Sequence, residues 1–175
     1  KLMVYTACGG VDPSRTLPIF LDVGTNNKDL LEDPMYIGWR RERLTGDLYD
    51  EFIEKFVSSV KKKFPGVLLH WEDFGREKAY ENLHKYKDKI LSFNDDIQGT
   101  GVITAAAVLS VVNITRVPLN QQKIVIFGAG AAGTGIAEQI CKAMIQSGIS
   151  EKKARSLFYL IDKNGLLVSG IEGLN

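Results

Sequence analysis

Short apolar runs alternate along the chain with stretches in which apolar residues recur every three or four positions. The clearest such stretch is 47–63, which predicts a helix capped by Thr45 or Asp47 and closed by lysines. The apolar face expected for this helix consists of Leu48, Phe52, Phe56 and Val60. An alternation of this kind is typical of βα units around a mostly parallel sheet.

The same pattern predicts the remaining elements. Strands are expected at 17–21, 67–69, 90–93, 123–127 and 156–161. Helices are expected at 76–87, at 98–112 and after a glycine turn at 128–133, with an extra helical turn at 150–155. The fold class is therefore α/β, and the break between Asp96 and Val117 is a candidate domain boundary.

Composition narrows the class of protein. The net charge of +1 gives no electrostatic footprint for nucleic acid, and no apolar stretch reaches the roughly 20 residues that span a membrane. Cys8 and Cys141 lie far apart, which predicts free thiols in a reducing compartment: the cytoplasm, or the mitochondrial matrix in a eukaryote. The two histidines, His70 and His84, offer little to a zinc site, so carboxylates are the expected metal ligands.

Acidic residues follow the predicted strands. Glu72 and Asp73 follow the second strand, and Asp95 and Asp96 follow the third. The first strand ends at Asp22. If these strands are parallel neighbours, the carboxylates gather at the sheet edge where open α/β sheets bind ligands. A hard divalent cation would relieve their repulsion, and oxygen ligands favour Mg²⁺ or Mn²⁺. The alternative is that the acids cap the helices that follow them.

The glycine turn is the second candidate site. It follows a predicted strand and opens an apolar helix, the setting in which a dinucleotide pyrophosphate lies on the helix N-terminus. The predicted cofactor contacts are Gly128, Gly130, Ala131 and Gly133. Asp162 ends the returning strand and is placed to accept from the adenosine ribose 2′-OH, unless it only begins a loop.

Several stretches of the chain occur in the order and spacing of one family. They are KLMVYTACGG, LPIFLDVGTNN, HWEDFG, FNDDIQGTG, IFGAGAAGTGIAEQI and FYLIDKNGLL. The chain thereby resembles the large malic enzymes, and WEDFG together with FNDDIQGT is the most specific part of the resemblance. The absence of an initial methionine and the unfinished fold at Asn175 suggest a piece of a longer protein.

The resemblance implies a function and an organisation. The expected reaction is the oxidative decarboxylation of malate to pyruvate and CO₂ with a divalent metal and NAD, although NADP stays open. Residues 1–95 would be part of the catalytic and metal-binding α/β domain, and 96–175 the start of a Rossmann-like NAD-binding domain. The full-length protein is expected to form a homo-oligomer, a dimer or a tetramer.

The resemblance also assigns residues. Glu72, Asp73 and Asp96 match the metal ligands, as the reasoning from strand ends also suggests. Lys1 matches a general base for the malate hydroxyl, and Asp95 matches an acid near that lysine; taken alone, Lys1 is only a terminal lysine. The family's tyrosine acid and substrate-binding arginine would lie upstream of this chain, and its active-site asparagines downstream.

Three alternatives stay open. A malolactic enzyme, which converts malate to lactate and retains NAD, resembles the chain over the same span. An inactive fragment would bind nucleotide or metal, or only fold. A dehydrogenase of another class would share only the glycine turn, and the two acid pairs argue against it. Asp162 favours NAD because it would repel a 2′-phosphate, but relatives that use NADP can keep an acid there.

Overall fold

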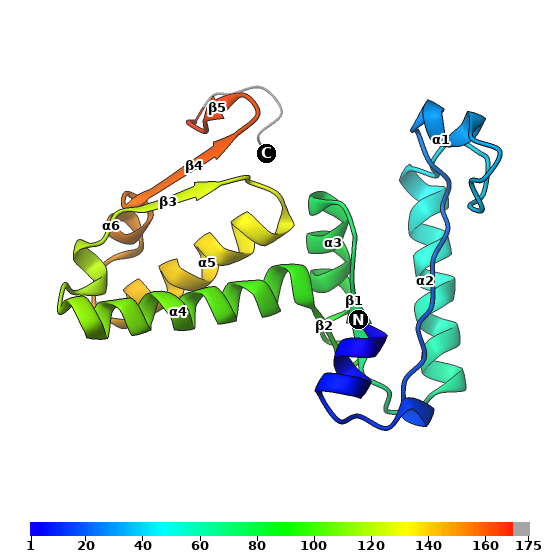
Figure 1. Cartoon of the computed structure of the whole chain (residues 1–175), viewed down its shortest axis with the longest axis horizontal. Helices are drawn as coiled ribbons and strands as arrows, with labels where there is room; N and C mark the ends of the chain where they lie inside the picture. Colours follow the sequence, from blue (N-terminus) through cyan, green and yellow to red (C-terminus); the bar gives the residue numbers. More distant parts are fainter. Residues whose placement is uncertain (170–175) are drawn as a thin grey trace. The chain divides into compact units, whose positions relative to one another are not determined.

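The computed structural model describes residues 1–169 of the chain (Figure 1). Its contacts divide the chain into two compact units, residues 1–59 and residues 60–175. Residues 170–175, the end of the predicted second domain, lie outside the described part.

The first unit is helical. It contains the short helix α1, Lys28–Glu32, and most of the long helix α2, Gly46–Lys63, which confirms the predicted helix. The buried face differs from the expected one and consists of Tyr49, Ile53, Val57 and Val60, whereas Leu48 is 64% exposed. Residues four apart drift by about 40° around a helix, so the spacing alone did not single out one face.

The strand predicted at 17–21 was wrong. Among residues 1–59, all of which the structure describes, none lies in a strand, and Phe20 is 95% exposed. A strand needs a neighbour for its backbone groups, and an apolar run does not supply one. Asp22, expected at the sheet edge with the other acids, instead accepts the backbone N–H groups of Gly24 (3.0 Å) and Trp39 (2.6 Å). These bonds, the Gly24 bond first, lower the pKa of Asp22.

A small parallel sheet opens the second unit. Strand β1, Leu69–Trp71, pairs in parallel with β2, Ser92–Asn94, and helix α3, Arg76–Tyr86, connects them. The helix confirms the prediction, whereas both strands lie nearer the C-terminus than expected. Trp71 explains the shift for β1, because its side chain is 1% exposed and lies 5.8 Å from the buried Tyr86 ring, whereas Leu68 is 52% exposed.

The glycine turn lies within a βαβ unit, as predicted. Strand β3, Ile124–Phe127, pairs in parallel with β4, Phe158–Asp162, and β4 pairs antiparallel with the short β5, Gly165–Leu166. Between β3 and β4 the chain forms helix α5, Ala131–Gln146, and the expected extra turn, α6, Glu151–Arg155. The Ser150 hydroxyl accepts from the Lys153 N–H and caps α6.

Helix α4, Thr100–Thr115, lies beside α5 in Figure 1. The two helices share a buried cluster that includes Ala105 on α4 with Ile140 and Met144 on α5. Glycines allow the close approach, because a Cβ on Gly101 would lie 2.9 Å from the carbonyl oxygen of Gly135. A Cβ on Gly135 would in turn collide with the backbone of Ile97.

The helical segment Asp95–Thr115 is also long and apolar enough to cross a membrane, with 21 residues and a mean hydropathy of 1.6. The expectation that no stretch reaches this length was therefore wrong on this measure. Only 17% of the apolar window is buried, so the packing of Gly101 on Gly135 accounts for a small part of its apolar surface. Length and composition alone do not assign this helix to a membrane.

Candidate functional site

Two acid pairs follow the paired strands β1 and β2. The register places Trp71 opposite Asn94, so that Glu72 and Asp95, the next residue on each strand, leave the sheet side by side. The backbone N–H of Asp73 donates to Asp96 Oδ2 over 3.0 Å. The parallel pairing predicted for these strands is thus present, and it brings all four carboxylates to one edge.

Glu72 and Asp95 lie together with a histidine that the sequence reasoning did not include. Ligand atoms of His70, Glu72 and Asp95 all lie within 4.8 Å of one another. His70 Nε2 is 3.2 Å from Glu72 Oε2, and its ring lies against Phe93 with 4.4 Å between centroids. The two-residue period of a strand, which puts His70 and Glu72 on one face, was the available signal.

Asp73 and Asp96 line a pocket of about 480 Å³, and residues of the glycine turn line the same pocket. The residues lining it are Asp73, Phe74, Asp96, Ile126, Phe127, Gly128, Gly130, Ala131, Ala132, Gly133 and Ile136. The predicted metal ligands Asp73 and Asp96 and the predicted cofactor-binding glycines Gly128, Gly130 and Gly133 therefore line one cavity.

The donor set suits a hard cation. Carboxylate oxygens are the ligands that Mg²⁺ and Mn²⁺ prefer, and the acids at this edge supply them from adjacent positions. The Asp73 N–H holds Asp96 Oδ2 in place. Asp73 itself has a φ of 61°, a left-handed conformation that aspartate tolerates better than most residues.

Asn94, rather than either aspartate, caps the helix that follows β2. Its Oδ1 accepts the Ile97 N–H (2.9 Å), and its own N–H donates to Gln98 Oε1 (2.9 Å), an arrangement like a capping box. Asn94 is fully buried. The first turn, Asp95–Gly99, is a π-helix, a feature frequent at functional sites. The alternative that the two aspartates are there as caps loses its main support.

The same turn fits the Asp95 carboxylate closely against Gly99. A Cβ on Gly99 would collide with Asp95 Oδ1. Glycine at this position therefore keeps the carboxylate close to the helix backbone.

The glycines of the dinucleotide turn differ in what they do. Gly128 has a φ of 96°, a conformation that requires glycine. A Cβ on Gly133 would collide with the Gly128 carbonyl oxygen, so Gly133 allows the helix to pack on the strand. Gly130 has ordinary backbone angles and no atom within 4 Å of its Cβ position, which leaves open space for a ligand at the start of α5. Ala131 begins α5 and packs against a buried cluster formed by Ala79 and Leu83 of α3 with Ile97.

Asp162 lies at the end of β4, next to the glycine turn. Its Oδ1 accepts the Lys163 N–H (2.7 Å) and its Oδ2 accepts the Ala129 N–H (3.2 Å). The Lys163 bond, then the Ala129 bond, lowers the pKa of Asp162, and the charge of Arg76 adds to the effect. Asp162 is therefore an ionised acceptor beside the turn.

Arg76 was missed by the sequence reasoning. It is the first residue of α3, and its Nη1 donates to the Ala129 carbonyl oxygen over 2.9 Å, across 53 positions of sequence. No local pattern signals a contact of this range.

Lys1 belongs to the first unit and the acids belong to the second, so the structure does not test its predicted role as a base. Its carbonyl oxygen accepts the Tyr5 N–H (3.0 Å) at the start of a short π-helix, Val4–Cys8. The role assigned to Lys1 remains a prediction.

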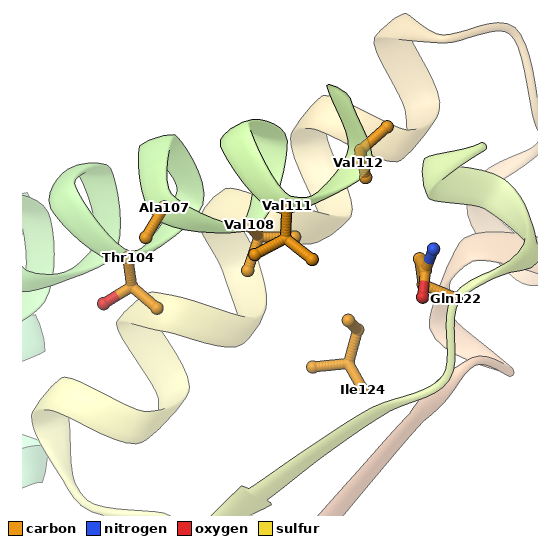
Figure 2. A pocket seen from close by; sticks show the side chains of 7 residues that line it. All are labelled: Thr104, Ala107, Val108, Val111, Val112, Gln122 and Ile124. Atoms are coloured by element: carbon orange, nitrogen blue, oxygen red, sulfur yellow. The ribbon is translucent and has the colours of Figure 1, made fainter. Parts of the chain in front are cut away.

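A second hollow, of about 270 Å³, lies between α4 and the start of β3. Five of its seven lining side chains in Figure 2 are aliphatic, and Thr104 and Gln122 are polar; the lining is Thr104, Ala107, Val108, Val111, Val112, Gln122 and Ile124. Without titratable groups in its lining, this hollow offers no catalytic chemistry.

Known proteins resemble the chain over nearly all of its length. The family model described as "Malic enzyme, N-terminal domain" matches residues 1–87, and the model described as "Malic enzyme, NAD binding domain" matches residues 97–175. A malolactic enzyme of Leuconostoc mesenteroides is 53% identical over 99% of this chain and 32% of its own length. NAD-dependent malic enzyme 3 of Bacillus subtilis is 51% identical over 99% of this chain and 31% of its own length.

A solved structure shows the same similarity. The crystal structure of the Entamoeba histolytica malic enzyme matches 98% of this chain and 29% of its own, with a TM-score of 0.64 and 25% identity. The chain thus spans about a third of the length of the relatives it matches.

Proposed function

Because this chain belongs to the malic enzyme family, we propose that its full-length protein converts malate to pyruvate and CO₂ while reducing NAD, with Mg²⁺ or Mn²⁺. The observation that carries the proposal is the parallel pairing of Trp71 with Asn94. That pairing puts both acid pairs at one sheet edge, in the same unit as the glycine turn.

The acids would divide two tasks. Glu72, Asp73 and Asp96 would hold the cation, which supplies Lewis-acid stabilisation of the charge that develops on the substrate oxygen. By the family resemblance, Lys1 would be the general base that takes the hydroxyl proton as hydride leaves C2 of malate, and Asp95 would serve in orientation or proton relay. Support for the ligand set comes from the bond between Asp73 and Asp96. The Glu72 carboxylate lies instead within 4.8 Å of ligand atoms of His70 and Asp95, so its place in the set rests on the family resemblance.

The glycine turn would bind the dinucleotide. Gly128, Gly130 and Gly133, followed by Ala131 at the start of α5, give the pyrophosphate access to the helix N-terminus. Asp162 would accept from the adenosine ribose hydroxyls, which favours NAD over NADP. Its two backbone N–H bonds support this role because they keep the carboxylate ionised.

A malolactic activity is the second candidate, because the two curated relatives differ from this chain to almost the same extent, at 53% and 51% identity. Both reactions would use the same acids and turn. We further propose a homo-oligomer, a dimer or tetramer, in the cytoplasm, with the catalytic domain ending near residue 95.

One experiment separates these functions. The full-length protein is incubated with malate, NAD and Mn²⁺, and NADH, pyruvate and lactate are measured together. Pyruvate formed in step with NADH supports the malic reaction. Lactate without net NADH supports the malolactic reaction. If the protein forms neither pyruvate nor lactate, the proposal is overturned.

A further inference from the structure

Arg76 occupies an unusual electrostatic position. As the first residue of α3, it places a cation at the positive end of a helix dipole, where a cation is disfavoured. Its guanidinium reaches the glycine turn through the Ala129 carbonyl oxygen, 2.9 Å away, and the turn opens α5, a second helix N-terminus. The guanidinium and the N-termini of α3 and α5 therefore all contribute positive potential beside Ala129.

The bond to Ala129 uses only one N–H donor of the Arg76 guanidinium. A guanidinium carries five N–H donors in a planar fork that matches two oxygens of a phosphate, and charged acceptors bind it more strongly than a neutral carbonyl. Asp162 accepts the N–H of the same residue, Ala129, at 3.2 Å. An arginine and a carboxylate thus flank the turn on its carbonyl and amide sides.

Open space runs along the glycine turn. The pocket of about 480 Å³ runs along Gly128, Gly130 and Gly133, and nothing lies within 4 Å of a Cβ position on Gly130. Arg76 does not line this pocket, but its guanidinium bonds Ala129, which lies between the lining residues Gly128 and Gly130. An anion held by the N–H groups at the start of α5 would therefore lie close to the guanidinium.

We propose that Arg76 binds a phosphate group of the dinucleotide, so that α3 contributes a cofactor-binding side chain to the glycine turn. The inference rests on the proposed dinucleotide function. The phosphate is the diphosphate bridge, which would lie at the start of α5. A ribose 2′-phosphate, which the Asp162 carboxylate would repel, is the other outcome of the test. Binding exchanges the neutral Ala129 carbonyl for a charged acceptor.

The test compares Arg76→Gln and Arg76→Lys with Lys87→Gln in the full-length protein. Lys87 follows the last residue of α3 and is exposed, so its change removes one charge from the other end of the same helix. Dissociation constants for NAD, NADP, ADP and adenosine are measured by calorimetry, with a thermal melt of each variant to show that it folds.

Loss of one charge-assisted hydrogen bond predicts roughly ten- to a hundredfold weaker binding by Arg76→Gln. Equal losses for NAD, NADP and ADP assign the diphosphate, and a loss for NADP alone assigns the 2′-phosphate. Adenosine binding should not change, and Arg76→Lys should recover part of the affinity.

Three results would overturn the inference alone: wild-type affinities in a folded Arg76→Gln variant, an adenosine loss as large as the ADP loss, or a loss no larger than that of Lys87→Gln. The last would reduce the effect to net charge. A wild-type protein that bound neither dinucleotide would instead overturn the proposed function, and the inference with it.

Discussion

The backbone N–H of Asp73 donates to the carboxylate of Asp96 across 23 positions of sequence, at 3.0 Å. This bond joins the loop after β1 to the turn after β2. It therefore makes the geometry of one acid pair depend on the other.

Asp96→Asn should separate the charge of Asp96 from its structural bond. An amide oxygen can still accept the Asp73 N–H, so the melting temperature should stay near that of the wild type. Affinity for Mn²⁺ should fall more than about a hundredfold, beyond the 10–100-fold typical of losing an outer-shell partner. Calorimetric titration of Mn²⁺ into the full-length protein measures the change.

Asp88→Asn is the matched control, because it removes one exposed carboxylate in the same unit. Metal affinity should be unaffected there. Unchanged Mn²⁺ affinity and metal-dependent turnover in Asp96→Asn would show that Asp96 is not a ligand.

Two glycines of the dinucleotide turn should respond in opposite ways to alanine. Gly130→Ala should fold normally, since its φ is −73° and no atom lies within 4 Å of the new Cβ, yet it should weaken NAD binding. Gly133→Ala places its Cβ against the Gly128 carbonyl oxygen and should lower stability by about 1–3 kcal/mol. Urea unfolding and NAD titration of both variants test the contrast, and normal NAD binding by Gly130→Ala would contradict it.

Much of the site could be predicted because it depends on local order. The strand ends at Trp71 and Asn94 are followed directly by acids, and parallel pairing then brings the acids together. The glycine turn could likewise be predicted from the succession of a strand, a turn and a helix. The division expected near residue 95 stays a prediction.

The failures share a physical cause, which is dependence on partners distant in sequence. Residues 17–21 have the composition of a strand but pair with no neighbour within the first unit. Arg76 reaches a carbonyl 53 positions away, which no periodicity encodes. The buried face of α2 was set by packing, so that Tyr49 is buried and Leu48 exposed.

The crossing of α4 and α5 should show graded sensitivity to methyl groups. Gly135→Ala drives its Cβ into the backbone of Ile97, which cannot rotate away, whereas Gly101→Ala meets the Gly135 oxygen at 2.9 Å. Overpacking costs about 1–3 kcal/mol, and the better helix propensity of alanine returns up to about 1 kcal/mol. We therefore expect Gly135→Ala to destabilise most and Gly101→Ala less, in urea unfolding of the full-length protein.

The Gly135 variant should also affect metal binding, because Ile97 directly follows Asp96. A Mn²⁺ affinity reduced together with stability would fit this coupling. Ser110→Ala, an exposed change on α4, serves as the control and should alter neither property. A Gly135→Ala protein as stable as the control would contradict the close packing.

Asp162 should contribute stability that depends on pH. Its folded pKa is lowered, first by the Lys163 N–H and then by the Ala129 N–H, so the folded state holds its proton less tightly than the unfolded state, whose pKa is about 3.9. The contribution is therefore fully present above that unfolded value and is lost as the pH falls through the lower folded value.

The wild type should have a higher melting temperature than Asp162→Asn at neutral pH, and this difference should close only in acid. Thermal melts of both proteins from neutral to strongly acidic pH, with Asp88→Asn as the control, measure it; a gap that already closes near neutral pH would mean that the carboxylate does not hold the turn.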